Sequence, residues 1–470
     1  MADEALKQQI DSYVDEEWES IVNDIDSMVH IESVEDIPHA EPGKPFGPKS
    51  YEALQQGLTI AEKLGLEPHN GEGYIGFADL PGESEKQIAT IAHTDIVPTG
   101  IGWHTDPLKV TRRDGYLLGR GTLDDKGPFV LSLYAAHFFV KQVQKTGKKL
   151  PYTLRCLVGC NEETHMRDVE WYLDHYPQPD FLFTPDADFP LICGEKGRML
   201  VEFTTPAIAD TIKDFHAGTV VNAIPGLAHM TIVADATKLS KQDNIEMEPQ
   251  DDGTVKLAAH GKGGHASMPW DAQNAIGILV NYMVDNSLVE GAEKQFFEFE
   301  RHIFADWEGT ELGITSENET FGKLSASGGT IAEQDGAFTQ TVDIRYPNST
   351  DMDTISAALT KTAAPFGVTY RCVEDMVPFY TDPRTPEIQT LLGAYNEYTG
   401  RHDEAFTIGG GTYARHFKNA CAFGPHDSRV EDPSWVGIEH GPDEGIEEDQ
   451  LKLALKVYIL SIARLMQLDL

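Results

Sequence analysis

Residues 91–100 read IAHTDIVPTG, and their first two residues end a short apolar segment, Ile88–Ala92. That segment is typical of a buried strand, and His93 and Asp95 follow at its carboxyl end. Side chains two residues apart in an extended chain lie on one face. A metal-bound imidazole usually donates its second ring N–H to a carboxylate. By itself this pattern is more often an ordinary polar loop; if the segment binds metal, His93 is the ligand and Asp95 is its supporting residue.

A second motif, GRGTLDDKGP at residues 119–128, places Asp124 and Asp125 in a glycine-rich turn before an apolar helix expected to begin near Phe129. Acidic residues at this place are often only a helix cap and a partner of the helix dipole. The motif lacks the GxxxxGK[ST] pattern of a phosphate loop, and Asp124 replaces the third glycine of a dinucleotide fingerprint. Because a carboxylate can bridge two cations, one of these acids is a candidate bridging ligand.

Three more segments supply acidic or imidazole groups after apolar stretches: LRCLVGCNEETHM with Glu162 and Glu163, FLFTPDADFP with Asp186, and WVGIEHGPDE with His440. Each segment alone is typical of a solvated polar loop. Together the five motifs predict a pair of metal ions, because carboxylates and imidazoles suit zinc, manganese or cobalt. Neighbouring glutamates can also have different roles, because one can bind metal while the other acts as a general base that takes a proton from water.

In this order the motifs resemble the co-catalytic metallopeptidases that include aminoacylase, carnosinase, carboxypeptidase G and bacterial dipeptidase V. The resemblance covers nearly the whole chain and is closest to the dipeptidase V and carnosinase branch. It rests on GRGTLDDKGP, NEET, TPDADFP followed by GEKG, GHASMP, DIRYP, GGGTYAR and HGPDE.

The resemblance implies a dinuclear centre in which His93, Asp124 and Asp186 hold one ion. Asp124, Glu163 and His440 would hold the other, so that Asp124 is the bridge. Zinc is the favoured metal, with manganese or cobalt as alternatives. Glu162 would be the general base that activates water and then passes the proton to the leaving amine. The family also implies a cis peptide bond between Asp124 and Asp125.

GKGGHASMP, at residues 261–269, places His265 in a glycine-rich turn after the strand-like TVKLAAH. The matching family histidine donates to the tetrahedral oxyanion, a contribution of roughly 3 to 4 kcal/mol. His260 is a rival for this role. Either histidine could instead only satisfy the turn.

Three further segments are candidates for binding the substrate. Arg345, in TVDIRYP, has a planar fork that suits a free carboxylate, unless it forms a structural ion pair with Asp343. GGGTYAR offers backbone N–H groups at Gly410, Gly411 and Thr412, where glycines permit close approach, although an ordinary flexible turn has the same composition. Asn222, in VVNAIP, resembles a family position near the substrate.

The composition limits the possible partners. A net charge of −39 argues against nucleic acid, which requires clustered lysine and arginine. An odd count of five cysteines fits reduced thiols in a cytoplasm, and the polar, acidic start MADEALKQQI does not resemble a signal peptide. No membrane span is expected, because Lys452, Lys456 and Arg464 interrupt the apolar C-terminal stretch.

The pattern predicts an α/β fold, with a mostly parallel sheet flanked by helices and an inserted α+β lid domain. The 470 residues suffice for two cores. We expect a catalytic metal-binding domain from residues 1–194 and 382–470, with the lid at 195–381. A long amphipathic helix is expected at the N-terminus. In the dipeptidase V branch that the chain resembles, a large lid supplies its histidine within one chain, whereas the carnosinase branch is dimeric, so the resemblance is compatible with a monomer or a homodimer.

The leading hypothesis is a metal-dependent dipeptidase, a hydrolase acting on short peptides with a free C-terminal carboxylate. An amidohydrolase that removes an acyl group from an amino acid is a rival, because its substrate also carries a carboxylate. A noncatalytic metal-binding protein on the same fold is a second rival. Glu162 counts against it, since a binding protein has no use for a free base beside the metals.

Overall fold

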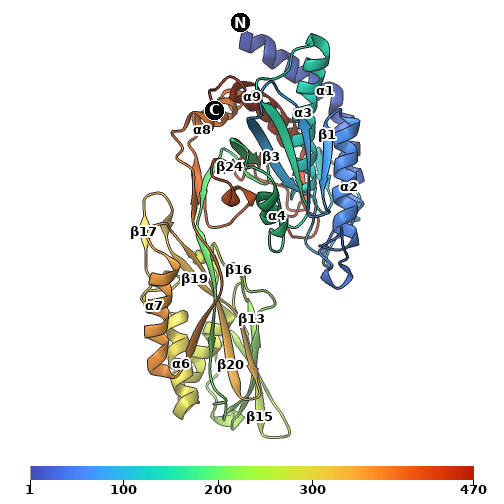
Figure 1. Cartoon of the computed structure of the whole chain (residues 1–470). Coiled ribbons are helices and arrows are strands. Elements are labelled where there is room, and N and C mark those ends of the chain that lie inside the picture. Colours follow the sequence, from blue (N-terminus) through green and yellow to red (C-terminus); the bar gives the residue numbers. More distant parts are fainter. Residues whose placement is uncertain (1) are drawn as a thin grey trace. The chain divides into compact units, whose positions relative to one another are not determined.

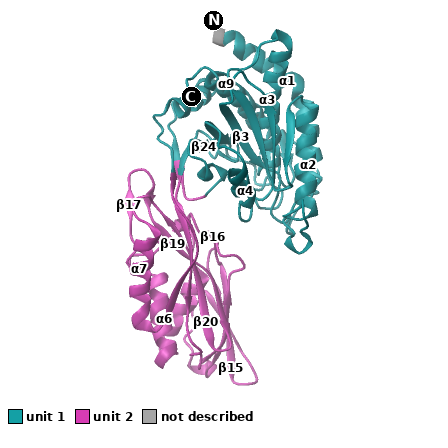
Figure 2. Ribbon diagram, viewed as in Figure 1, with its two compact units in different colours: residues 1–194, 380–406, 411–470 teal, residues 195–379, 407–410 magenta. Residues whose placement is uncertain are grey.

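The computed structural model describes residues 2–470, which form two compact units (Figures 1 and 2). Unit 1 comprises residues 1–194, 380–406 and 411–470, and unit 2 comprises residues 195–379 and 407–410. The chain therefore leaves unit 1 after Gly194 and returns to it near Tyr380.

Unit 1 is built around a mixed nine-stranded sheet. Its strands, in spatial order, are β1 (Glu67–Gly71), β2 (Ile75–Leu80), β6 (Thr153–Gly159), β3 (Gln87–His93), β7 (Phe181–Thr184), β24 (Ala420–Ala422), β9 (Ile192–Glu195) and β22 (Phe379–Tyr380), with β23 (Phe406–Ile408) also paired to β9. The central pairs β6–β3, β3–β7 and β7–β24 are parallel, whereas β1–β2, β2–β6 and β9–β24 are antiparallel. The sheet is thus parallel at its centre, where the motif-bearing strands lie.

Helices cover this sheet and bury apolar side chains, most of them through one face and α3 on nearly all sides over residues 126–140 (Figure 1). The predicted N-terminal helix is confirmed: Ile10, Val14, Ile21 and Ile25 are buried along it. The helices of unit 1 are α1 (Ala2–Val29), α2 (Pro48–Lys63), α3 (Lys126–Thr146), α4 (Arg167–His175), α8 (Pro386–Thr399) and α9 (Glu448–Leu465).

Helix α3 begins at Lys126, three residues before the expected start. Gly127 and Pro128 are compatible with its first turn, because first-turn N–H groups have no intrahelical acceptor. The acidic pair Asp124–Asp125 therefore lies directly at the start of this helix, and its peptide bond is cis, as the family resemblance implies.

Unit 2 is an antiparallel eight-stranded sheet packed against helices (Figure 2). The strand order is β14 (Ile245–Pro249), β15 (Thr254–His260), β13 (Leu227–Val233), β11 (Ile212–Ala217), β19 (Ser325–Gln334), β20 (Ala337–Tyr346), β10 (Gly197–Thr204) and β21 (Thr369–Met376). The helices are α5 (Ala275–Asp285), α6 (Gly291–Ile303) and α7 (Met352–Ala363). Alternation of buried and exposed residues along β10 and β15 gives one core-facing side.

Short elements complete both units. The small sheets are β12 (Ala223–Ile224) with β16 (Gly264–His265), β17 (Glu317–Asn318) with β18 (Gly322–Lys323), β25 (Pro425–His426) with β8 (Ala187–Asp188), and β26 (Gly445–Glu447) with β5 (Tyr116–Leu118) and β4 (Thr111–Arg113). The 3-10 helices are η1 (Ile37–His39), η2 (Ala236–Lys238), η3 (Pro269–Asp271), η4 (Ala364–Phe366) and η5 (Tyr413–His416). All five cysteines have free thiols. None of the helices in residues 2–470 combines the length and apolar character that crossing a membrane requires.

One ionisable group lies in the core of unit 2. Glu300 of α6 is fully buried, and neither carboxyl oxygen has a hydrogen-bond partner among the described residues. Burial raises the pKa of this carboxyl group well above its usual value. The folded protein therefore keeps Glu300 protonated at pH values where the unfolded chain has already lost that proton.

We predict that Glu300→Gln stabilises unit 2 increasingly as pH rises. Above the unfolded pKa of about 4.3, folding takes up a proton at Glu300, so the free energy of unfolding falls with pH until the folded pKa is reached. Within that window the advantage of the variant should grow by about 1.4 kcal/mol per pH unit. Urea unfolding at pH 5 to 8 measures the difference in the free energy of unfolding between the variant and the parent. Glu298→Gln, at a partly exposed residue of the same helix, is the control. A pH-independent difference between Glu300→Gln and the parent would contradict this prediction.

Candidate metal centre

Histidine and acidic side chains from separate segments meet at one edge of the unit 1 sheet. Because β3 is parallel to both β6 and β7, the carboxyl ends of these strands lie at the same edge, where open α/β sheets bind ligands. The residues are His93 at the end of β3, Asp124 before α3, Glu163 after β6, Asp186 after β7 and His440 before β26.

Asp124 contacts both imidazoles of this group. Its Oδ1 is 2.9 Å from Nε2 of His93, and its Oδ2 is 2.9 Å from Nε2 of His440. The His93 Nε2 atom is also 3.7 Å from Oδ2 of Asp186, and the His440 Nε2 atom is 3.0 Å from Oε2 of Glu163. Each Asp124 oxygen therefore faces one half of the group, as a carboxylate that bridges two cations requires.

The charges of this group fit bound cations. Burial and then the charge of Asp124 raise the pKa of Asp186 to about 7 and also raise the pKa of Glu163. Burial would raise the pKa of Asp124 as well, but hydrogen bonds from His440 and His93 lower it. The candidate ligand atoms of His93, Asp124 and Glu163 lie within 4.8 Å of one another. Such a set of oxygen and imidazole donors is suited to divalent metal ions, which would relieve the repulsion between the carboxylates.

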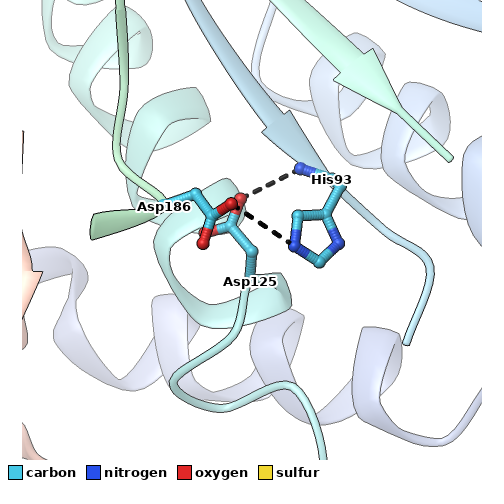
Figure 3. Close-up of side chains that lie close together, drawn as sticks. All are labelled: His93, Asp125 and Asp186. Carbon is cyan, nitrogen blue, oxygen red and sulfur yellow. Dashed lines mark hydrogen bonds and ion pairs between the residues drawn. The ribbon is translucent and has the colours of Figure 1, made fainter. Parts of the chain in front are cut away.

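Asp125 belongs to the same group, although the ligand set implied by the family resemblance includes only Asp124 of this acidic pair. Figure 3 shows Asp125 and Asp186 directed toward His93, and these three residues form a second set of candidate ligand atoms within 4.8 Å. Asp125 Oδ2 accepts a hydrogen bond from the backbone N–H of His93 at 2.9 Å. Its Oδ1 is buried without a hydrogen-bond partner among the described residues. The doubled aspartate in GRGTLDDKGP was the only sequence signal for this second acid.

Asp95 contacts the glutamate pair more directly than it contacts the His93 ring. His93 Nδ1 is 3.0 Å from the backbone oxygen of Asp95 and 3.5 Å from its carboxylate. The two carboxylate oxygens accept hydrogen bonds from the backbone N–H groups of Glu162 and Glu163, at 3.2 and 3.1 Å. The backbone carbonyl thus orients the ring, and the carboxylate holds the loop that carries both glutamates.

The two glutamates differ in their side-chain contacts. Glu163 Oε1 accepts a hydrogen bond from the backbone of Val97 at 3.2 Å, and its Oε2 faces His440. The Glu162 carboxylate accepts no hydrogen bond from the part of the chain that the structure describes. Burial and the charge of Asp186 raise the pKa of Glu162 well above its usual value. Since the pKa of Glu163 is raised as well, it is the side-chain contacts that distinguish Glu163, which faces His440, from Glu162, which is compatible with the predicted base.

Unit 2 carries the predicted oxyanion donor. His265 is exposed in β16, and its Nδ1 lies 3.2 Å from the donating backbone N–H of Ser267 and 2.6 Å from the Ser267 hydroxyl. Since Nδ1 accepts the backbone hydrogen bond, the neutral ring carries its proton on Nε2. The rival His260 is 3.3 Å from Glu246 in an exposed ion pair.

Arg345 forms an ion pair with Asp343, which is the structural alternative to binding a substrate carboxylate. It is 5% exposed, and its Nε and Nη2 atoms donate to the two carboxylate oxygens of Asp343 at 2.5 and 3.0 Å. Its Nη1 atom donates to the backbone oxygen of Gly409 at 2.8 Å. Arg345 is therefore joined to the first residue of GGGTYAR, the other segment predicted to bind a carboxylate.

A second cation, Lys196 of the GEKG segment, lies beside this arginine and was missed in the sequence. Burial and then the charge of Arg345 lower the pKa of Lys196. Its backbone N–H donates to Ile408 at 2.9 Å, and a Cβ at Gly409 would be 3.1 Å from the Ser267 side chain. The segments bearing Lys196, Arg345, His265 and Gly409 are therefore neighbours within unit 2.

The other predicted substrate residues have local structural contacts. The Thr412 side chain caps η5 by accepting from Ala414 at 3.2 Å, and Gly410 and Gly411 precede it. The backbone oxygen of Asn222 accepts from Ala266 at 2.9 Å, which places Asn222 beside the His265 turn.

Comparison with known proteins tests the family resemblance. The model of peptidase family M20/M25/M40 matches residues 89–464. The chain is 31% identical over 464 residues to a Beta-Ala-Xaa dipeptidase of Lactobacillus delbrueckii subsp. lactis, covering 95% of this chain and 96% of that protein.

Two solved structures have the same fold. Human carnosine dipeptidase 1 aligns with a TM-score of 0.61 at 15% identity, covering 98% of this chain and 99% of that one. The dipeptidase Dug1p of Saccharomyces cerevisiae aligns with a TM-score of 0.59 at 12% identity, covering 99% of each chain. With the family model matching most of the chain, the resemblance seen in the motifs is confirmed, and the protein belongs to peptidase family M20/M25/M40.

Proposed function

We propose that this protein is a metal-dependent dipeptidase that hydrolyses short peptides with a free C-terminal carboxylate. The observation that carries the proposal is the contact of Asp124 with both His93 and His440, one through each carboxylate oxygen. In a chain of this peptidase family, that contact supports a dinuclear metal centre.

His93, Asp124 and Asp186 would hold one divalent ion, and Asp124, Glu163 and His440 the other. Zinc is favoured, with manganese or cobalt as alternatives. When bound, the two ions would polarise the scissile carbonyl group and activate water. Glu162 takes the proton from that water and passes it to the leaving amine. Asp95 keeps Glu162 and Glu163 in place through their backbone N–H groups.

His265 donates through Nε2 to the oxygen that becomes negative as the carbonyl is attacked. The hydrogen bond from the Ser267 backbone N–H to Nδ1 of His265 supports this role, because an accepting Nδ1 places the proton of the neutral ring on Nε2. Arg345, Lys196 and the Gly410–Thr412 segment bind the substrate carboxylate, with Asn222 contacting the peptide. The Lactobacillus relative, named a Beta-Ala-Xaa dipeptidase, makes β-alanyl dipeptides the first substrates to test.

The five free thiols support a cytoplasmic enzyme. The acidic composition argues against nucleic acid as a partner, and the relative named a dipeptidase supports small peptides instead. The chain would act as a monomer or a homodimer. Removal of an acyl group from an N-acyl amino acid is the second candidate function, because Arg345 and Lys196 would bind that carboxylate equally well.

We predict that chelated enzyme regains hydrolysis of free dipeptides with zinc or manganese, and that Glu162→Gln lowers kcat roughly a hundred- to ten-thousand-fold. The variant loses the base but keeps the proposed ligands, so its metal content should be unchanged. Hydrolysis of a panel containing β-alanyl-histidine, α-dipeptides and acetylated amino acids measures this, alongside metal analysis.

Glu431→Gln is the control, because it removes an exposed carboxylate that does not adjoin a proposed ligand. It should retain most activity. Hydrolysis confined to acetylated amino acids would identify a deacylase. Full activity in Glu162→Gln would exclude Glu162 as the base, and no metal-dependent hydrolysis of any substrate would favour a binding protein.

A second prediction separates the two histidines of the same segment. His265→Ala should lower kcat roughly a hundred- to a thousand-fold with little change in KM, because it removes one oxyanion donor. His260→Ala should leave both parameters nearly unchanged, since His260 pairs with Glu246 at the surface. Steady-state kinetics on one dipeptide test this, and the reverse pattern would transfer the role to His260.

Lys196→Met should weaken recognition of the substrate carboxylate while preserving the apolar part of the side chain. Loss of one charge-assisted hydrogen bond is worth about 1.5 to 3 kcal/mol, or roughly 10- to 100-fold in kcat/KM. The decrease should be confined to dipeptides with a free carboxylate, so kcat/KM for the corresponding dipeptide amides provides the comparison. An equal loss on acids and amides would argue against carboxylate binding by Lys196.

A further inference from the structure

The loops that carry Asp124 and His440 are brought together by a small sheet in unit 1. Strand β5 leads into the Asp124 loop, and β26 follows the His440 loop. Antiparallel pairing places Leu118 opposite Gly445. The backbone N–H of Gly119 continues this contact by donating to the backbone oxygen of Glu444 at 2.9 Å.

The Glu444 side chain then holds the Asp124 loop through its backbone. Glu444 is fully buried, and its Oε1 accepts hydrogen bonds from the N–H groups of Gly121 at 2.8 Å, Leu123 at 3.2 Å and Asp124 at 3.2 Å. Its other oxygen pairs with Arg120. One carboxylate thus fixes the turn in which the proposed bridging ligand lies.

Arg120 connects this carboxylate to the backbone of the second loop. It is 1% exposed and donates from Nη1 to Glu444 and from Nη2 to the backbone oxygen of His440 at 3.0 Å. His440 has a positive φ of 62°, a conformation that non-glycine residues rarely adopt. The guanidinium therefore fixes a peptide group whose conformation determines where the His440 imidazole points.

We infer that Arg120 and Glu444 are positioning residues that set the separation between Asp124 and His440 before metal binds. The inference rests on the proposed function, because it assumes that these two residues are metal ligands. Arg120 and Glu444 act through main-chain groups, the N–H of Asp124 and the C=O of His440. The planar guanidinium of Arg120 reaches Glu444 through Nη1 and the His440 carbonyl through Nη2, so one rigid group joins both loops, which a lysine ammonium with a single nitrogen does less precisely.

A buried pair elsewhere in unit 1 provides a matched control. Arg155 of β6 donates from Nε and Nη2 to the two carboxylate oxygens of Asp79 in β2, at 2.8 and 2.7 Å. This arginine is 7% exposed and also donates from Nη1 to the Tyr172 hydroxyl at 2.9 Å, and neither Asp79 nor Tyr172 is a proposed metal ligand. Replacing either arginine by lysine removes a buried guanidinium that joins two partner groups, but only Arg120→Lys removes one that contacts the loops of the proposed ligands.

The test is the zinc affinity of metal-free Arg120→Lys, Glu444→Gln and Arg155→Lys, titrated against a chromophoric chelator. Absorption of the cobalt-loaded proteins and urea unfolding are measured in parallel. We expect Arg120→Lys and Glu444→Gln to weaken the weaker zinc-binding step roughly 10- to 100-fold and to alter the cobalt spectrum. Arg155→Lys should bind zinc within about twofold of the parent, the scatter expected of a distant site, even if it unfolds at lower urea.

Parental zinc affinity and cobalt spectrum in Arg120→Lys would overturn the inference, as would equal weakening in Arg155→Lys. If Glu444→Gln does not fold, the zinc affinities of Arg120→Lys and Arg155→Lys still test the positioning role of Arg120. Dipeptide hydrolysis by the parent is assayed separately. A parent that binds two ions without hydrolysing dipeptides would refute the proposed function and leave the positioning roles intact.

Discussion

Repulsion between clustered carboxylates is the constraint around which unit 1 is built. Two like charges about 4 Å apart cost about 4 kcal/mol at an effective dielectric constant near 20. Asp124 is stabilised in its charged form by both imidazoles, whereas Asp186 and Glu162 have raised pKa values. Two histidines cannot neutralise five acids, so divalent cations are the natural complement of the group. The acids are Asp124, Asp125, Glu162, Glu163 and Asp186.

Such a group persists only if the loops that carry it are held by the remaining fold. Buried carboxylates that accept hydrogen bonds from backbone N–H groups supply much of this restraint. Each hydrogen bond to a charged group contributes about 1.5 to 3 kcal/mol to stability. Asp95 holds the glutamate loop, and Glu444 holds the aspartate loop. Asp168 accepts from Cys160 at 2.8 Å and from Asn161 at 3.0 Å, and also from the Tyr413 hydroxyl. The metal centre thus depends on a surrounding layer of acids whose partners are main-chain amides.

The sequence predicted the parts of this arrangement that depend on local pattern. Apolar strands ending in acidic or histidine residues indicated which segments would meet, since parallel strands share an edge; β3, β6 and β7 follow this rule. Contacts between distant segments were not predictable in this way. Nothing near Glu444 in sequence indicates that its carboxylate binds the amides of Gly121, Leu123 and Asp124. Likewise, Asp95 binds the amides of Glu162 and Glu163, which lie 67 and 68 positions further along the chain. Lys196 and Arg345 are far apart in the sequence, and only the fold of unit 2 brings their charges close together.

Arg345 illustrates why a structural and a binding role need not exclude each other. A guanidinium has five N–H donors, and Arg345 uses three of them for Asp343 and the Gly409 carbonyl. The pair with Asp343 fixes the plane of the fork, and the bond to Gly409 aligns it with the GGGTYAR segment. A side chain held in this way loses little conformational entropy when it binds an anion. In the proposed function the buried ion pair would support a carboxylate site, with Lys196 supplying the positive charge that Asp343 cancels on Arg345.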